Sequence, residues 1–219
     1  MNTAIIPVAK ENDTTPWQTN PTWWIDLHKI HIAETAKKQD AKYIFMGDSI
    51  TNQWIEQPAW EKYFAETALN LGIGGDQTCH LLWRLENNPN LKNINPEAII
   101  ILIGTNNIGH NENNPEETVE GIIKVSETVS VIFPKAKQVL LSVLPRGKNK
   151  NDGMRLKVDE INNFLESHKF NSEFVNLFDI GDIFLEDDLT IKKEVMHDFL
   201  HLTKEGYSRF ANALIKHLQ

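Results

Sequence analysis

The sequence predicts an α/β fold, a three-layer α/β/α sandwich in which helices cover both faces of a five-stranded parallel sheet. Five short apolar runs are spaced along the chain, and segments with helical periodicity separate them. Runs that are apolar throughout are typical of strands buried on both faces, as parallel strands are. The 219 residues suffice for one substantial core, so we expect one main domain.

The strands are expected where apolar runs end in a turn residue. Residues 98–103 form the strongest run, which is rich in β-branched residues, too short for an isolated helix and closed by Gly104. Residues 43–46 form a similar run that is closed by Gly47. The other predicted strands are 68–71, 139–143 and 174–177.

Helices are expected between the strands, where capping residues mark their ends. Asn114 as N-cap, Pro115 at the first helical position and two glutamates after it indicate a helix that continues to about Phe133. Thr203 is expected to cap the last helix, at the C-terminus. The other predicted helices are 22–38, 76–87 and 153–167.

The first 21 residues are polar and contain three prolines, so we expect an extended arm ahead of a domain over residues 22–219. The arm has no signal-like apolar core, because Pro7 stops its short apolar stretch, and no run of the chain approaches membrane-spanning length. We therefore expect a cytoplasmic location and no integral membrane segment. A chain from which a leader had been removed would have the same sequence.

The composition limits the classes of partner that the chain is expected to bind. A net charge of −8 leaves no surplus of Lys and Arg to neutralise phosphates, so we expect no nucleic-acid partner. The single cysteine, Cys79, excludes an internal disulfide and leaves no zinc-type cluster of cysteines and histidines. A small molecule is the expected ligand.

Three chemically useful segments follow predicted strands. Ser49 comes after the first strand, Gly74 and Gly75 after the second, and Asn106 after the third. In open parallel sheets, ligands bind outside the carboxyl ends of the strands, where the connections diverge. We therefore expect these residues to meet on one rim of the sheet.

Each segment has a catalytic and a structural interpretation. Ser49 at a helix start lies where free N–H groups favour a developing negative charge, but serine is also a common N-cap. Gly74 and Gly75 allow close approach of the backbone to a reacting atom, or simply end a strand. The Asn106 amide can donate to an oxyanion, or simply form part of a turn.

Gln77 stands where a dinucleotide-binding motif has its last glycine, so the sequence disfavours dinucleotide binding.

Asp198 and His201, three residues apart, supply an acid–base pair. Serine attacks an ester only if a base takes its proton, and histidine is that base when a carboxylate fixes its tautomer. Ser49, Asp198 and His201 can therefore form a catalytic triad. The alternative is a metal site with His197 as a third ligand, for which no further ligand set is evident.

Four segments taken together resemble the sequence blocks of the SGNH (GDSL) hydrolase family over about residues 22–215: 47–49, 75, 104–106 and 198–201. Within the family the chain looks most similar to the catalytic α subunits of platelet-activating factor acetylhydrolase and their bacterial relatives. The resemblance implies a flavodoxin-like sheet, Ser49 as nucleophile, and an oxyanion hole from the N–H groups of Ser49 and Gly75 and the Asn106 side chain. It also implies no metal and no other cofactor.

The resemblance carries two further expectations. Side chains at Ile50, Thr105 and Leu200 crowd the acyl site, which favours a short acyl group such as acetyl, and a homodimer is expected. The loops 108–114 and 147–153, which would line the alcohol side, carry no motif. We expect a cofactor-independent carboxylic-ester hydrolase; the alternatives are a carbohydrate O-deacetylase and a non-catalytic binding subunit on the same scaffold.

Overall fold

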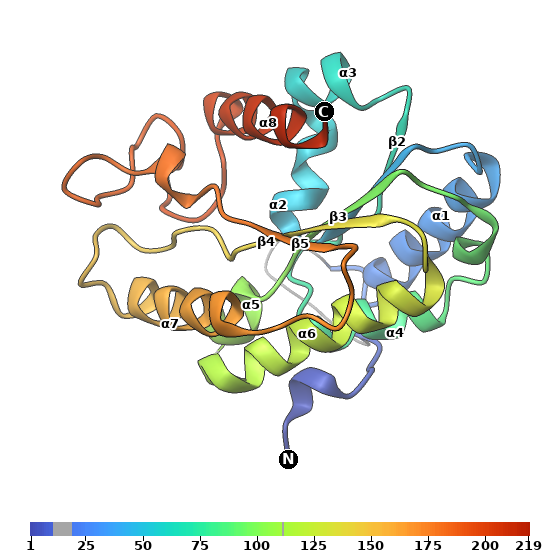
Figure 1. Ribbon diagram of the computed structural model, residues 1–219, viewed down its shortest axis with the longest axis horizontal. Coiled ribbons are helices and arrows are strands. Elements are labelled where there is room, and N and C mark those ends of the chain that lie inside the picture. Colours follow the sequence, from blue (N-terminus) through green and yellow to red (C-terminus); the bar gives the residue numbers. More distant parts are fainter. Residues whose placement is uncertain (11–18, 111) are drawn as a thin grey trace.

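The computed structural model describes residues 1–10, 19–110 and 112–219 and contains one five-stranded parallel sheet with the order β2-β1-β3-β4-β5. Helices cover both faces of the sheet, which confirms the predicted α/β fold class (Figure 1). The strands are β1 Tyr43–Gly47, β2 Ala68–Asn70, β3 Ala98–Leu102, β4 Lys137–Leu141 and β5 Val175–Phe178.

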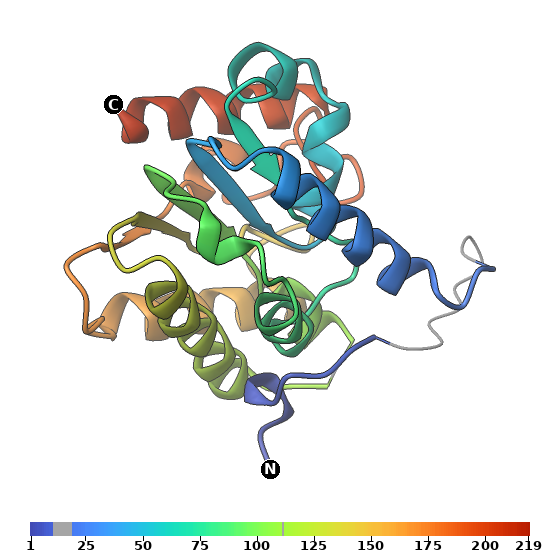
Figure 2. The same cartoon turned by 90° about the vertical axis from the view of Figure 1, so that its right-hand side faces the viewer.

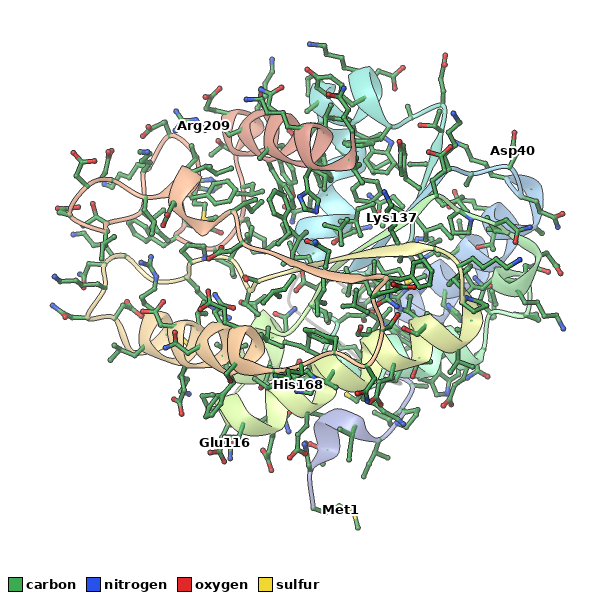
Figure 3. All side chains as sticks on the ribbon, in the orientation of Figure 1. Met1, Asp40, Glu116, Lys137, His168 and Arg209 are labelled. Atoms are coloured by element: carbon green, nitrogen blue, oxygen red, sulfur yellow. The ribbon has the colours of Figure 1, made fainter. Side chains whose placement is uncertain are left out.

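The helices form two layers. In Figure 1, α3 and α8 lie above the sheet, and α4, α6 and α7 lie below it. Polar side chains such as Glu116 and Arg209 point outward from α6 and α8 (Figure 3). The helices are α1 Trp23–Lys37, α2 Ser49–Asn52, α3 Pro58–Tyr63, α4 Thr78–Glu86, α5 Thr105–Gly109, α6 Pro115–Ile132, α7 Gly153–Ser167 and α8 Lys204–Leu218.

Alternation of side chains along the strands explains why the strand sequences are apolar throughout. Ile44 and Met46 of β1 belong to the core under α4, α6 and α7, whereas Phe45 between them belongs to the core under α3 and α8. Phe45 packs there in an aromatic cluster with Trp54 and Phe64. Both faces of the sheet are therefore buried, as expected for parallel strands.

The capping signals in the sequence place the long helices correctly. Asn114 is the N-cap of α6 and accepts a 2.9 Å hydrogen bond from the Glu117 N–H. Thr203 caps α8 by accepting from the Gly206 N–H at 3.2 Å. The predicted helix at 153–167 coincides with α7. Between β1 and β2, the helix start expected at Ser49 is that of α2, but the sequence does not predict the end of α2 or the presence of α3. Each spans six residues or fewer and is too short for a periodic pattern.

The beginning of the chain is docked against the domain. Residues Thr3–Ile5 form a 3-10 turn, and the buried Ala4 accepts a 2.8 Å hydrogen bond from the Thr78 hydroxyl through its carbonyl. Figure 2 shows this segment passing beneath α4 and α6. Residues 11–18 of the predicted arm lie outside the described part of the chain. A domain boundary at residue 22 stays a prediction.

The strand order determines where a site can form. From β1 the chain continues to β2 on one side, whereas from β3 it continues to β4 on the other side. The connections therefore diverge at the carboxyl ends of β1 and β3, which is where ligands bind in open parallel sheets. Among the helices of the described residues, none is both long enough and apolar enough to cross a membrane.

Candidate active site

Ser49 lies directly beyond β1, at the first position of α2. The N-cap of α2 is Asp48, whose Oδ1 accepts a 2.9 Å hydrogen bond from the Ile50 N–H. Ser49 is therefore not the capping residue of this helix. Its backbone N–H is among those at a helix start that have no partner within the helix.

The Ser49 hydroxyl faces a histidine from the other end of the chain. Its Oγ lies 3.1 Å from Nε2 of His201. Nδ1 of His201 lies 2.7 Å from Oδ2 of Asp198. A proton on Nδ1, held by the carboxylate, leaves Nε2 free to accept the serine proton. The structure thus brings together Ser49, His201 and Asp198, which the sequence analysis had linked.

The spacing of Asp198 and His201 has a local explanation. Oδ1 of Asp198 accepts hydrogen bonds from the backbone N–H groups of Leu200 at 3.1 Å and His201 at 2.7 Å. Phe199 turns the chain with φ of +62°, a left-handed conformation that is uncommon for residues other than glycine. This tight loop, Asp198 to His201, folds the ring of His201 back onto the carboxylate.

The environment of Asp198 favours its charged form. Partial burial by itself would raise its pKa, but the hydrogen bonds from the His201 ring and from the N–H groups of His201 and Leu200 outweigh burial and hold the pKa below its usual range. The side chains of Asp198 and His201 are 40% and 28% exposed, respectively. Solvent therefore reaches the acid–base pair.

The predicted donors lie in the loop after β2 and in α5, which follows β3. A Cβ atom placed on Gly74 would lie 3.9 Å from Cβ of Ser49, so the loop after β2 passes close to the serine. Gly75 has φ of +73°, the left-handed region that favours glycine. Asn106 is buried in α5, where its Nδ2 donates a 3.0 Å hydrogen bond to the Asp76 carbonyl. An amide has two N–H groups, so a second one is left to donate.

The three residues expected at the acyl site have different surroundings. Ile50 and Thr105 are buried, and Leu200 is half-buried beside His201. The Ile50 carbonyl accepts a 2.7 Å hydrogen bond from the Tyr207 hydroxyl. The Thr105 carbonyl accepts one of 2.9 Å from Arg146.

In the alternative metal site, His197 would be the third ligand. His197 is exposed, and within the described ranges no three His, Cys, Asp or Glu side chains are grouped to hold a metal ion.

On the predicted alcohol side, residue 111 of the loop 108–114 lies outside the described ranges. The other loop, 147–153, is held at its start by a 3.0 Å hydrogen bond from the Gly147 N–H to the Phe199 carbonyl.

Asp48 is a buried ionisable group for which the sequence predicts no role. The residue is 1% exposed, and its Oδ2 has no hydrogen-bond partner among the described residues. Burial raises the pKa of Asp48 to about 7; the Ile50 N–H and the cation of Arg146 oppose this rise, whereas the nearby Asp76 carboxylate adds to it. The position of Asp48 beside Ser49, after a buried strand, is the only signal the sequence offers.

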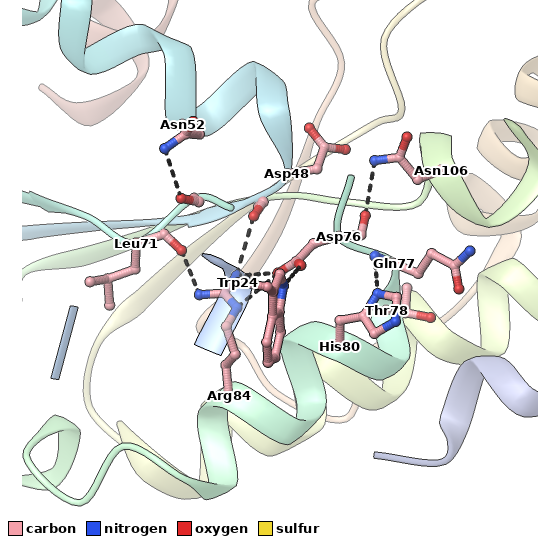
Figure 4. Close-up of polar contacts among 12 residues, drawn as sticks. Trp24, Asp48, Asn52, Leu71, Asp76, Gln77, Thr78, His80, Arg84 and Asn106 are labelled. Atoms are coloured by element: carbon pink, nitrogen blue, oxygen red, sulfur yellow. Dashed lines mark hydrogen bonds and ion pairs between the residues drawn. The ribbon is translucent and has the colours of Figure 1, made fainter. Parts of the chain in front are cut away.

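Asp76 and Arg84 form a buried ion pair beneath the rim, with 2.7 Å between Oδ2 and Nη2 (Figure 4). Both are nearly inaccessible to solvent. Arg84 lies on the same face of α4 as Leu81 and Leu85, where an apolar residue is expected. A charge at an apolar position of an amphipathic helix is the sequence signal that points to a buried partner.

Comparison with known proteins gives consistent results. Residues 45–209 match the family model described as GDSL-like Lipase/Acylhydrolase family. Over 192 residues the chain is 34% identical to platelet-activating factor acetylhydrolase IB subunit alpha1 of Homo sapiens, which covers 87% of this chain and 80% of the relative. The corresponding alpha2 subunit of Rattus norvegicus is 36% identical over 192 residues, with coverage of 87% and 81%.

A solved structure of a GDSL-like lipase from Bacteroides thetaiotaomicron resembles the chain in fold. The TM-score is 0.71 at 21% sequence identity, and the match covers 87% of this chain and 96% of the other. At this level of identity the likeness concerns the fold alone. It agrees with the parallel sheet and its helical layers described above.

Proposed function

The chain belongs to the GDSL-like lipase/acylhydrolase family, and from this premise we propose that it is a serine hydrolase of short-acyl carboxylic esters, acetyl esters above all. The observation that carries the proposal is the continuous contact from Ser49 through His201 to Asp198, at 3.1 Å and 2.7 Å. Family membership supports ester hydrolysis in general, and these contacts supply residues for it.

In the proposed reaction, Oγ of Ser49 attacks the ester carbonyl carbon while Nε2 of His201 takes the hydroxyl proton. The carbonyl π electrons move to oxygen, which becomes an oxyanion. When the tetrahedral intermediate collapses, the bond to the alcohol oxygen breaks and His201 returns its proton to that oxygen. Water then attacks the acyl-enzyme by the same route and releases the acid. Asp198 remains ionised throughout and orients the imidazole.

We assign the oxyanion to the N–H groups of Ser49 and Gly75 and to the side-chain N–H of Asn106 that does not bind Asp76. Donors already in place at a developing charge need no reorganisation during the reaction. Loss of one such donor typically costs about 3–4 kcal/mol of transition-state stabilisation. The left-handed conformation of Gly75 and the fixed amide of Asn106 support this assignment.

We further propose that Ile50, Thr105 and Leu200 limit the length of the acyl group. Ile50 follows Ser49 in the chain, Thr105 precedes Asn106 and Leu200 precedes His201, so each is adjacent in sequence to a residue of the proposed site. The relatives named above are acetylhydrolases, which supports acetyl as the preferred group. The proposed mechanism needs no metal and no other cofactor.

The proposal is tested with 4-nitrophenyl acetate and the variant Ser49→Ala. We expect the variant to lose turnover while its thermal unfolding stays close to that of the wild type. Ser167→Ala, at an exposed serine at the end of α7, is the matched control and should keep full activity. Labelling with a fluorophosphonate should modify Ser49. Absence of labelling together with absence of turnover in the wild type would instead favour a non-catalytic binding subunit.

Substrate panels refine the proposal. Acetyl esters should react faster than butyryl esters, and faster turnover of octanoyl than of acetyl esters would contradict a crowded acyl site. For the alcohol, acetylated sugars and xylan fragments should be compared with acetyl phospholipids. Preference for the sugars would identify a carbohydrate O-deacetylase. A homodimer and a cytoplasmic location stay predictions from family membership and sequence.

A further inference from the structure

We propose that Arg84 and Asp76 are positioning residues that hold the proposed oxyanion donors in place. The inference rests on the proposed function, because it assigns these residues to the same reaction. It concerns neither the nucleophile nor the acid–base pair. Its basis is a set of buried contacts that join the backbone just before Ser49 to the backbone on both sides of Gly75.

Arg84 connects three parts of the rim. Its Nη1 donates a 2.6 Å hydrogen bond to the Leu71 carbonyl, just after β2. Its Nη2 donates to the Gly47 carbonyl at the end of β1, at 3.3 Å. Its Nε donates to Oδ2 of Asp76 at 2.8 Å. A planar guanidinium offers donors in a fixed fork, so one side chain fixes the relative positions of the two strand ends and the carboxylate (Figure 4).

Asp76 extends these contacts to the other donors. It follows Gly75 directly, so a fixed Asp76 limits how the Gly75 peptide can rotate. Its backbone carbonyl accepts the Nδ2 hydrogen bond of Asn106 at 3.0 Å, which sets the plane of that amide. Its Oδ1 accepts a 2.6 Å hydrogen bond from the indole Nε1 of the buried Trp24. The carboxylate is thus held from two sides, and its own backbone holds Asn106.

These contacts fit a role in geometry better than a role in stability alone. The helix α4 already packs Leu81, Leu82 and Leu85 into the core beneath the sheet, so it does not depend on Arg84 for docking. Buried ion pairs often add little net stability compared with apolar residues of similar volume. Electrostatic stabilisation of a transition state, in contrast, requires donors that are fixed before the reaction.

The test uses a substitution that removes one of the hydrogen bonds to the Asp76 carboxylate. Trp24→Phe removes the Nε1–H donor and keeps an aromatic ring. We expect kcat for 4-nitrophenyl acetate to fall about tenfold, because the donors lose alignment but none is deleted, with KM changed less than about twofold. Trp83→Phe is the matched control, since this neighbouring indole packs 5.5 Å from Trp24. It should leave both constants near their wild-type values.

A second variant and a second readout keep a folding defect apart from a positioning defect. Arg84→Lys retains the charge beside Asp76 but lacks the fork that reaches both carbonyls, so kcat should fall about a hundredfold. The second-order rate of fluorophosphonate labelling should fall in parallel, because the phosphoryl oxygen needs the same donors. Thermal unfolding is measured for each variant. A lower melting temperature with unchanged kcat and labelling rate would overturn the inference.

The controls separate this inference from the proposed function. If the wild type and Trp83→Phe show no turnover that depends on Ser49, the proposed function fails. If both show it and Trp24→Phe reacts as fast as Trp83→Phe, the proposed function stands and the positioning role of Asp76 and Arg84 is wrong.

Discussion

The acid–base side and the donor side of the candidate site are held in place by different means. On the acid–base side, the contacts that orient His201 lie within four consecutive residues, and solvent reaches the pair. On the side of the proposed donors, Asn106 donates to the carbonyl of Asp76, which follows Gly75 in the chain and contacts residues of α5, α4 and α1 in a buried network. The first arrangement is local and the second depends on the packing of the whole sheet edge.

Two aspartates near the same serine show the consequence for charge. Asp198 is 40% exposed and accepts hydrogen bonds from two backbone N–H groups and a ring nitrogen, so its pKa is lowered. Asp48 is 1% exposed and accepts one backbone bond, so its pKa is raised to about 7. Solvent and hydrogen bonds stabilise a carboxylate, and burial without them destabilises it. Two aspartates near one serine therefore have pKa values that are shifted in opposite directions.

The largest effect is expected from the local side. Asp198→Asn keeps the size of the side chain but removes the charge that fixes the His201 tautomer, so kcat for 4-nitrophenyl acetate should fall by about 10⁴. Its thermal unfolding at neutral pH should change little, because the residue is exposed. Steady-state kinetics and calorimetry measure the two quantities. A loss of activity smaller than about tenfold would argue against Asp198 as the orienting acid.

Gly75→Ala tests the donor side. At φ of +73° a side chain is strained, and its Cβ would lie 2.9 Å from Nζ of Lys10, so the peptide should rotate and misplace its N–H. We expect kcat to fall by about 10²–10³. Gly153→Ala at the start of α7 is the control, since its Cβ would meet no atom within 4 Å. Equal activity of the two variants would show that the reaction does not require glycine at position 75.

The same contrast explains how far the sequence could predict the structure. The helix caps at Asn114 and Thr203, and the spacing of Asp198 and His201, are local patterns, and each agrees with the observed contacts. The partners of Arg84 could not be predicted in this way. Two of them are backbone carbonyls, 37 and 13 residues away in the chain, and a carbonyl has the same chemistry in every residue. Only the strand order brings them to one guanidinium.

The smallest expected effect is a pH dependence of stability, which tests the raised pKa of Asp48. With a pKa of about 7 in the folded protein against a usual value of 3.8, Asp48 keeps a proton that the unfolded chain has already released. Its contribution to the free energy of unfolding therefore becomes less favourable as pH rises from 3.8 towards 7. Asp48→Asn can still cap α2 but cannot ionise. Relative to wild type, its stability should improve by on the order of 2 kcal/mol between pH 5 and pH 8.

Urea unfolding at the two pH values measures this difference. Asp188→Asn is the matched control, because this exposed aspartate also accepts a hydrogen bond from the N–H group two residues further along. The hydrogen bonds from the Thr190 hydroxyl and N–H hold the pKa of Asp188 below its usual range, so this carboxyl is ionised in both the folded and the unfolded chain over this range. Its substitution should therefore shift stability equally at both pH values. If Asp48→Asn also gave equal shifts, the buried carboxyl would be ionised throughout, and the contrast between the two sides would lie in their hydrogen bonds rather than in their charges.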